Sequence, residues 1–155
     1  MTYVLGKTSL ARLDGVHPDL VKVVKRAITI SDQDFGVFEG VRSLETQRKY
    51  MARGVTRTMK SKHLVQGDGF GHAVDLVPYI DGTLRWEWGA IWPIADAMRR
   101  AAGEEGVVLR WGGVWDRRLN LLQHGPEGLK AEVSAYSARH PGPDFLDGPH
   151  YELVA

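Results

Sequence analysis

Three histidines of this chain stand close to acidic residues in two short segments. His63 precedes a glycine-rich stretch that leads to His72 and Asp75, and His150 follows Asp147. Two imidazoles and one carboxylate, with a fourth position open to water, form the ligand set of a catalytic zinc ion. Such an ion lowers the pKa of its bound water toward about 7, and a further carboxylate can then act as general base and later as general acid. The two segments therefore predict a metal site that hydrolyses a carbonyl compound.

A strand expected at residues 73–78 helps to choose the ligands. Successive side chains of a strand alternate between its faces, so His72 and Asp75 point to opposite sides. Asp75 therefore pairs more naturally with a histidine from elsewhere, and His63 is that residue, because the glycines between them let the chain fold back at little steric cost. We expect His72 to have a structural or hydrogen-bonding role, with metal binding as its alternative.

The second segment needs an interruption in its strand. Asp147 and His150 would also face opposite ways on an unbroken strand. Gly148 and Pro149 can break the strand, which would turn Asp147 back toward a metal held by His150. Glu152 shares the face of His150 if the strand begins at Pro149, and its expected use is a hydrogen bond, either one that supports a metal ligand or a structural one.

The elements that must position these side chains follow from apolar spacing and from cap residues. Apolar residues at helical spacing predict helices, and stretches rich in Phe and Val predict strands. Ser43 can cap the second helix, and Gly54 and Gly103 can end the second and third. The expected helices span residues 18–28, 43–53, 88–102 and 129–138, and the expected strands span residues 35–41, 73–78, 107–111 and 149–154. This order predicts an α+β fold, in which helices pack on one side of a mainly antiparallel sheet.

The composition limits the possible chemistry. The chain has 155 residues, of which 43% are hydrophobic and 25% are charged, as in an average globular domain. No apolar run has the roughly 18 residues of a membrane span, and the first residues lack the features of a signal peptide. Cysteine is absent, so a metal site must use His, Asp and Glu, and cysteine nucleophiles are excluded. The formal net charge of +1 gives no overall attraction to nucleic acid.

Basic residues nevertheless gather in one stretch of the chain. Between Arg42 and Lys62, Glu45 is the one acid among seven basic residues. The basic residues are Arg42, Arg48, Lys49, Arg53, Arg57, Lys60 and Lys62. They form either a solvated helix face with a basic loop or a patch that meets an anionic polymer such as a cell wall. The stretch has no aromatic-interleaved groove or motif typical of nucleic-acid binding.

Taken together, these segments resemble the zinc peptidases of the D-alanyl-D-alanine carboxypeptidase and L-alanyl-D-glutamate endopeptidase family. The family's pattern reads Ser-x-His, then Gly-x-Ala-x-Asp, and later Asp-x-x-His followed by an aromatic residue and Glu. The matching segments of this chain are Ser61–His63, Gly71–Pro78 and Asp147–Leu153, with a lead-in of Glu39–Ser43, Gln47, Gly54 and Thr56. The segment Arg110–Trp115 is similar to the Trp-Gly-Gly-x-Trp segment of phage endolysins of this type.

The resemblance implies a role for each residue of the motifs. His63, Asp75 and His150 would hold zinc, and Asp147 would activate its water. Arg42 would stabilise the developing oxyanion or bind a substrate carboxylate, since a planar and permanently charged fork suits either task.

Other positions have weaker claims on the site. Gln47 would support Arg42 or make polar contacts in its helix. Trp111 and Trp115 would line the substrate cleft or pack in the core.

One departure from the family's pattern concerns the first ligand. Gly71 follows His63 by five more positions than in the family, an insertion within residues 65–70. The insertion leaves open that His72 replaces His63 as a ligand. The inserted loop could instead add a contact to the substrate or form a lid.

The resemblance implies a hedgehog/DD-peptidase-like fold and a zinc-dependent endopeptidase of the phage endolysin branch. Its substrate would be the L-alanyl-D-glutamate bond of stem peptides in bacterial peptidoglycan. The alternatives are a D-Ala-D-Ala carboxypeptidase or dipeptidase on the same scaffold, and a non-catalytic zinc-containing binding domain. We expect one catalytic domain over residues 1–155, without a separate wall-binding module or signal peptide. The chain would act as a monomer, without nucleic acid or membrane insertion, and would wait in the host cytoplasm before it reaches the wall.

Overall fold

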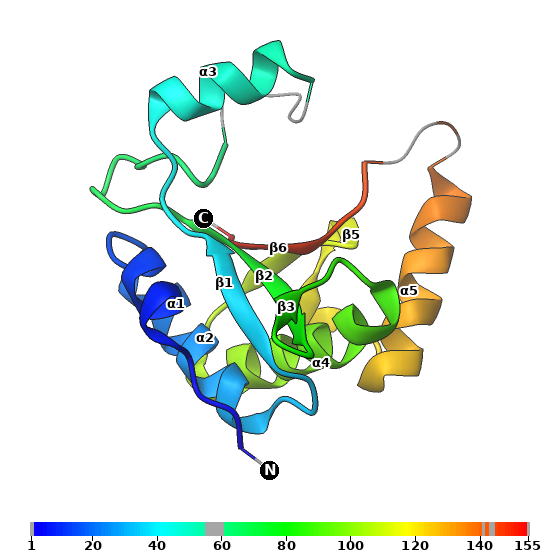
Figure 1. Cartoon of the computed structure of the whole chain (residues 1–155). Coiled ribbons are helices and arrows are strands. Elements are labelled where there is room, and N and C mark those ends of the chain that lie inside the picture. The colour runs from blue at the N-terminus through cyan, green and yellow to red at the C-terminus, as the bar shows by residue number, and fades with distance from the viewer. Residues whose placement is uncertain (1, 55–60, 141, 143–144, 155) are drawn as a thin grey trace.

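One six-stranded sheet organises the molecule (Figure 1). The computed structural model describes residues 2–54, 61–140, 142 and 145–154. The strands follow the order β1-β2-β6-β4-β5, with β3 paired to β2, and each of these pairs is antiparallel. The strands are β1 (Phe35–Glu39), β2 (Ala73–Ile80), β3 (Thr83–Leu84), β4 (Leu109–Gly112), β5 (Val114–Arg118) and β6 (Asp147–Leu153).

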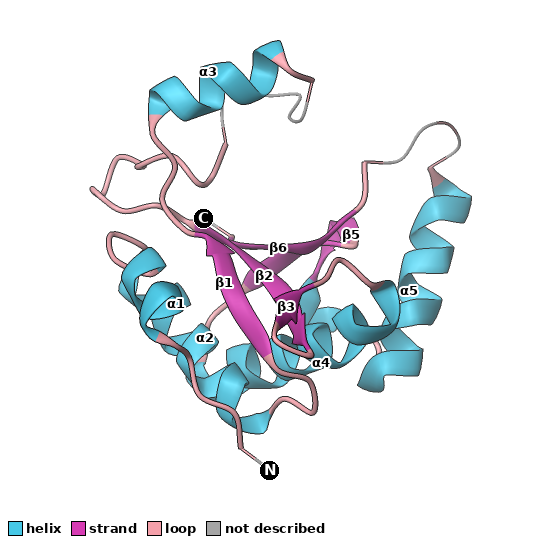
Figure 2. Cartoon of the chain, in the orientation of Figure 1, coloured by secondary structure: helices cyan, strands magenta, loops and turns pink. Residues whose placement is uncertain are grey.

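The helices divide unequally between the two sides of the sheet. They are α1 (Lys7–Arg12), α2 (Pro18–Ile30), α3 (Leu44–Ala52), α4 (Trp88–Glu105) and α5 (Gly125–Arg139), with a short 3₁₀ turn at Leu119–Leu121. Figure 2 shows α1, α2, α4 and α5 together on one side, whereas α3 stands apart on the other. The predicted α+β class with an antiparallel sheet is confirmed. No helix among the described residues combines the length and apolar character that crossing a membrane requires.

The apolar stripes of α2 and α4 form the core against the sheet. The buried stripe of α2 consists of Leu20, Val23, Val24, Ala27 and Ile28. The buried stripe of α4 consists of Ile91, Ile94, Ala95, Ala97, Met98, Ala101 and Ala102. Each large side chain in such a stripe stabilises the fold by about 1.5–3 kcal/mol. This packed layer gives the strands that carry His150 and Asp75 a rigid support.

Two helix ends test the cap predictions. Ser43 caps α3 as expected, since its Oγ accepts a hydrogen bond from the Thr46 amide at 3.1 Å. The expected end of α4 at Gly103 is wrong, because the helix continues to Glu105. Gly106 ends it with a φ of 68°, a left-handed conformation that glycine adopts without a Cβ clash.

Three elements lie outside the predicted set: α1, β3 and β5. The first two are too short for a periodic apolar signal. β5 pairs with β4 in a hairpin inside the segment that resembles endolysins. Of the basic stretch and its lead-in, Thr56, Arg57 and Lys60 lie outside the described residues.

Candidate active site

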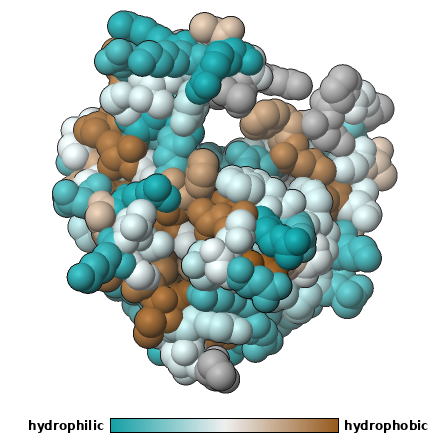
Figure 3. Space-filling view, in the orientation of Figure 1, coloured by the Kyte–Doolittle hydropathy of each residue, from teal (hydrophilic) through white to brown (hydrophobic). Residues whose placement is uncertain are grey.

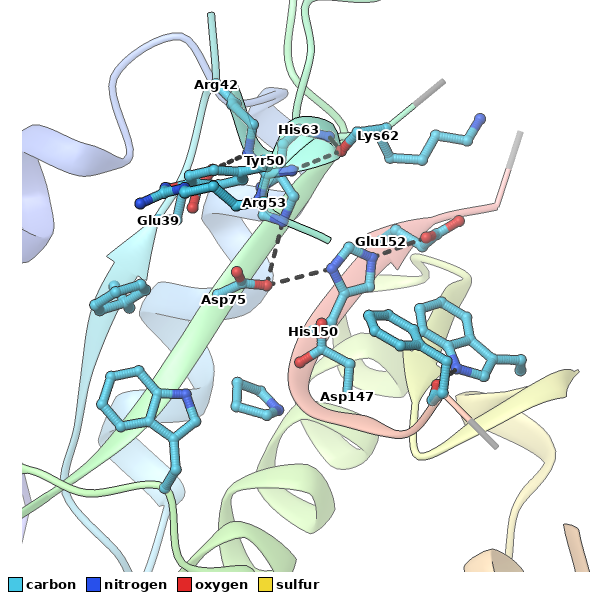
Figure 4. Close-up of a pocket in the computed structure, with 16 residues that line it drawn as sticks. Glu39, Arg42, Tyr50, Arg53, Lys62, His63, Asp75, Asp147, His150 and Glu152 are labelled. Carbon is cyan, nitrogen blue, oxygen red and sulfur yellow. Dashed lines mark hydrogen bonds and ion pairs between the residues drawn. The ribbon is translucent and has the colours of Figure 1, made fainter. Parts of the chain in front are cut away.

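A cavity of about 950 Å³ lies between α3 and the sheet. Figure 3 shows a hollow beneath the hydrophilic surface of α3. Its lining includes all five residues predicted to do chemistry, which Figure 4 shows facing one another. These residues are Arg42, His63, Asp75, Asp147 and His150.

Three of these residues are arranged as a metal site would require. One ligand atom each of His63, Asp75 and His150 lies within 4.8 Å of the other two. Asp75 Oδ1 is 3.2 Å from His63 Nε2 and 3.2 Å from His150 Nδ1. Ligand atoms bound tetrahedrally to one zinc ion are about 3.3 Å apart, given metal–ligand bonds of about 2.0–2.1 Å. The Asp75 oxygen therefore lies at the spacing of zinc ligands from both imidazole nitrogens, and the three groups have the chemistry of a zinc site.

Hydrogen bonds on the outer side of each imidazole direct the other nitrogen inward. His63 Nδ1 donates to the carbonyl of Gly40 at 2.8 Å, so Nε2 is the nitrogen that faces Asp75 and would bind a metal. His150 Nε2 lies 2.8 Å from Glu152 Oε1, so Nδ1 faces Asp75. The hydrogen bond expected of Glu152 is confirmed.

The strand register brings the ligands from distant parts of the chain together. Asp75 of β2 lies directly opposite His150 of β6, so both side chains project from the same face of the sheet. The pairing of β6 with β4 then shifts abruptly, because Trp111 pairs with Tyr151 and its neighbour Gly112 pairs with Asp147. Residues 148–150 therefore have no partner in β4, although His150 still pairs with Asp75 of β2, and Asp147 lines the same cavity as His150.

The Trp-Gly-Gly segment shapes this bulge. Trp111 is fully buried, and its indole N–H donates to the Gly148 carbonyl at 2.7 Å. A Cβ at Gly112 would lie 2.1 Å from the Asp147 carbonyl oxygen, and a Cβ at Gly113 would lie 2.6 Å from the Trp111 ring. Only glycine allows both close approaches. Trp111 was expected either to line the substrate cleft or to pack in the core, and it packs in the core.

Trp115 takes the other role and lines the cavity. Its indole N–H donates to the Phe145 carbonyl at 2.6 Å, and its ring centroid is 5.3 Å from that of His150. Trp115 thus forms a wall beside the metal group.

The contacts with Asp75 set the charge of the metal group. Burial opposes ionisation of Asp75, but hydrogen bonds from His150 and His63 outweigh burial and hold the pKa of Asp75 well below its usual range. Burial alone would lower the pKa of His150, but hydrogen bonds with Asp75 and Glu152 raise this pKa to about 10. Without a metal, His150 is therefore a cation at neutral pH.

Asp147 has the opposite electrostatic character. Burial and then the negative charge of Asp75 raise the pKa of Asp147 to about 6, although the charges of His150, His63 and Arg42 act against this rise. A carboxyl group with such a pKa exchanges protons readily near neutral pH, which suits a general base.

Arg42 is held firmly at the edge of the cavity. Its Nε donates to Glu39, and its Nη1 donates to Gln47 Oε1 at 2.7 Å. Its guanidinium lies over the Tyr50 ring, 4.6 Å from the centroid, and its side chain is 8% exposed. Gln47 therefore supports Arg42, the first of the two roles expected of it.

The insertion leaves His63 in place and holds His72 elsewhere. The backbone N–H of Gln66 donates to the Phe70 carbonyl at 2.8 Å, so the extra residues close into a loop of their own. His72 Nε2 lies 2.7 Å from Asp68 Oδ2, and its ring packs against His17 with centroids 5.3 Å apart. Among the described residues, the group able to hold a metal does not include His72.

Several aromatic cavity residues were not predicted as part of a site: Phe38, Tyr50, Trp86 and Phe145. Phe38 is the extra residue of a bulge in β1, where Val37 pairs with Leu76 and Glu39 with Asp75. Its ring meets Trp86 edge to face at 5.0 Å. No sequence pattern singles these residues out, because the exposure of Phe38 (41%) and Trp86 (56%) is evident only in the folded chain.

The chain is similar to known proteins over most of its length. Residues 1–154 match the family of phage L-alanyl-D-glutamate peptidases. The L-alanyl-D-glutamate peptidase of Escherichia phage T5 is 34% identical over 120 residues, which are 75% of this chain and 84% of that protein. The crystal structure of the L-Ala D-Glu endopeptidase ChiX from Serratia marcescens matches with a TM-score of 0.72 and 35% identity, over 97% of this chain and 90% of that chain. The matched range contains every residue of the candidate site.

Proposed function

Because the chain belongs to the phage L-alanyl-D-glutamate peptidase family, it is a peptidase of peptidoglycan, and we propose that it hydrolyses the L-alanyl-D-glutamate bond of stem peptides with the help of zinc. The observation that carries the zinc-dependent mechanism is the convergence of His63, Asp75 and His150 within 4.8 Å at the base of a cavity that Asp147 also lines. Zinc, when bound, supplies a positive charge that makes a water acidic near neutral pH and polarises a carbonyl group.

Asp147 handles the protons of the reaction. Its carboxylate accepts a proton from the attacking water while the water oxygen bonds to the carbonyl carbon of L-alanine. It then delivers this proton to the departing nitrogen of D-glutamate as the C–N bond breaks. A pKa of about 6 supports this role, because the group is mostly ionised at neutral pH yet gives its proton up and takes it back easily.

Arg42 stabilises the negative charge that develops on the carbonyl oxygen. Glu39 and Gln47 already accept from Nε and Nη1, so the Nη2 hydrogens are the donors that no described residue accepts. A charged donor fixed before the reaction favours the transition state over the substrate. Binding of a substrate carboxylate is the less supported role, since Glu39 offsets the charge of Arg42.

The cell wall is the proposed macromolecular partner. The exposed basic residues of α3, Arg48 and Lys49, would attract a polymer that carries carboxylates, and the cavity of about 950 Å³ lies beside this helix. We propose that the chain acts as a monomer and reaches the wall from the host cytoplasm.

Product analysis tests this function. Purified peptidoglycan is digested, and newly exposed amino groups are labelled and identified. D-Glutamate, or its amidated form, is the expected new amino terminus, and a chelator should abolish its release until zinc is restored. Free D-alanine as the sole product would instead identify a D-Ala-D-Ala carboxypeptidase.

A further inference from the structure

Among the described residues, three cationic side chains line the cavity: Arg42, Arg53 and Lys62. They differ in what already surrounds them. Arg42 is nearly buried and ion-paired with Glu39. Figure 4 shows the Lys62 side chain extending away from the three candidate metal ligands. Arg53 differs from both in its surroundings.

The Arg53 guanidinium is positively charged, and no described residue accepts a hydrogen bond from its N–H groups. Its guanidinium packs over the Tyr50 ring, 5.4 Å from the centroid, a contact that orients the fork but leaves its N–H groups available. The Arg42 guanidinium also packs over the Tyr50 ring, 4.6 Å from its centroid, so one aromatic ring positions both guanidinium groups. The amide of Arg53 donates to the Lys49 carbonyl at 3.1 Å, which fixes the backbone at the end of α3.

The substrate of the proposed reaction brings an anion to this region. The nitrogen of the bond to be cut belongs to D-glutamate, whose α-carbon also carries a carboxylate when the stem peptide continues through the γ-carboxyl group. That carboxylate is only two bonds from the reacting nitrogen, so it must enter the cavity close to the metal group. Asp75, Asp147 and Glu152 line the same cavity and would repel it. An anion in such surroundings requires a cation that is not already neutralised.

We propose that Arg53 binds the α-carboxylate of the substrate's D-glutamate residue and thereby makes the enzyme prefer the free acid over the α-amide. This inference rests on the proposed function, because it assumes cleavage at the D-glutamate nitrogen. Arginine suits the task, since its planar fork can donate two parallel hydrogen bonds to one carboxylate. An amide at the same position offers one acceptor oxygen and no charge. Arg53 is exposed, so we expect a preference of about tenfold, the low end for a hydrogen bond between charged groups.

The test compares two short synthetic stem peptides that differ only in this group. One carries D-glutamate with a free α-carboxylate, and the other carries its α-amide. The ratio of their kcat/KM values is measured for the wild type, for Arg53→Gln and for Arg48→Gln. Arg48 is the matched control, because it is an exposed arginine on the same helix that does not line the cavity.

The wild type should cleave the acid about tenfold better. Arg53→Gln should bring the ratio near one by slowing cleavage of the acid alone, and Arg48→Gln should keep the wild-type ratio. A general loss of folding would slow both peptides equally and could not mimic this result. Equal cleavage of both peptides by the wild type, or a ratio unchanged by Arg53→Gln, would overturn the inference. Failure of the wild type to cleave either peptide would instead contradict the proposed function.

Discussion

The indole nitrogen of Trp111 donates a hydrogen bond of 2.7 Å to the carbonyl of Gly148, inside the turn that separates Asp147 from His150. A fully buried tryptophan on the neighbouring strand thus holds the backbone between the proposed base and a proposed metal ligand. The distance between these two functional groups depends on a residue that touches neither substrate nor metal.

Trp111→Phe should lower both stability and turnover. The substitution leaves the Gly148 carbonyl buried without its donor and removes ring volume, which together should cost about 2–4 kcal/mol in the free energy of unfolding. Looser placement of Asp147 should lower kcat about tenfold while zinc is retained. Urea unfolding, zinc content and kcat measure these effects. Trp92→Phe is the matched control, because Trp92 packs against the Trp111 ring but donates no hydrogen bond to this turn. Wild-type turnover in Trp111→Phe would show that the hydrogen bond does not position the base.

Gly112→Ala should lower stability and activity more than the addition of one methyl group usually does. The added Cβ would lie 2.1 Å from the Asp147 carbonyl oxygen, so β4 and β6 would have to separate at the site. We expect a loss of more than about 2 kcal/mol in stability and little remaining activity. Gly103→Ala is the contrasting variant, because a Cβ there meets nothing within 4 Å inside α4. It should stabilise the protein by about 0.5–1 kcal/mol through helix propensity and keep full activity. Thermal or urea unfolding compares the two variants directly.

The sequence predicts the local arrangement of the site better than its long-range arrangement. Alternation along a strand was enough to place the side chains of His72 and Asp75 on different sides. The Gly148-Pro149 pair was enough to predict the interruption between Asp147 and His150. The register that sets Asp75 opposite His150 depends on pairing between distant strands, which no local pattern specifies.

Other parts of the cavity wall were missed for a related reason. Arg53 resembles any solvated residue at a helix end, because its relevance comes from the sheet across the cavity rather than from its own helix. The ends of α4 show the same limit at shorter range. Gly103 and Gly106 are equally good stop signals in sequence, and only the left-handed φ of Gly106 distinguishes them.

Removal of each proposed ligand should release the metal. The wild type should bind about one zinc per chain, and His63→Ala, Asp75→Ala and His150→Ala should each lose zinc and activity. His72→Ala should keep most of both, because His72 bonds to Asp68 away from the metal group. Metal analysis of the purified variants decides the matter. Zinc lost from His72→Ala but kept by His63→Ala would reverse the assignment of the first ligand.

Zinc binding should release a proton at neutral pH. The raised pKa of His150, about 10 in the metal-free protein, means that the imidazole is protonated at pH 7 and must lose that proton before Nδ1 can bind a metal. Zinc affinity should therefore increase as pH rises from 6 to 8. Calorimetric titration in two buffers with different ionisation enthalpies should give about one proton released per zinc. A binding enthalpy that does not depend on the buffer would contradict the protonated state of His150.

Asp147→Asn should separate catalysis from stability. The amide keeps the shape of the side chain but cannot accept a proton, so the variant should retain zinc and lose about 10²–10⁴-fold in kcat.

In the metal-free protein, Asp147→Asn should increase the free energy of unfolding. The direction of this change follows from the raised pKa of Asp147, about 6. The unfolded chain ionises Asp147 near its ordinary pKa of about 3.9, so the wild type loses stability as pH rises from about 4 to about 6 and does not regain it above. The loss approaches about 2–3 kcal/mol, and Asp147→Asn avoids it. Urea unfolding with a chelator should therefore show a small difference between variant and wild type at pH 4.5 and a clear advantage for the variant at pH 7.5. An equal difference at both pH values would mean that the native protein does not raise the pKa of Asp147.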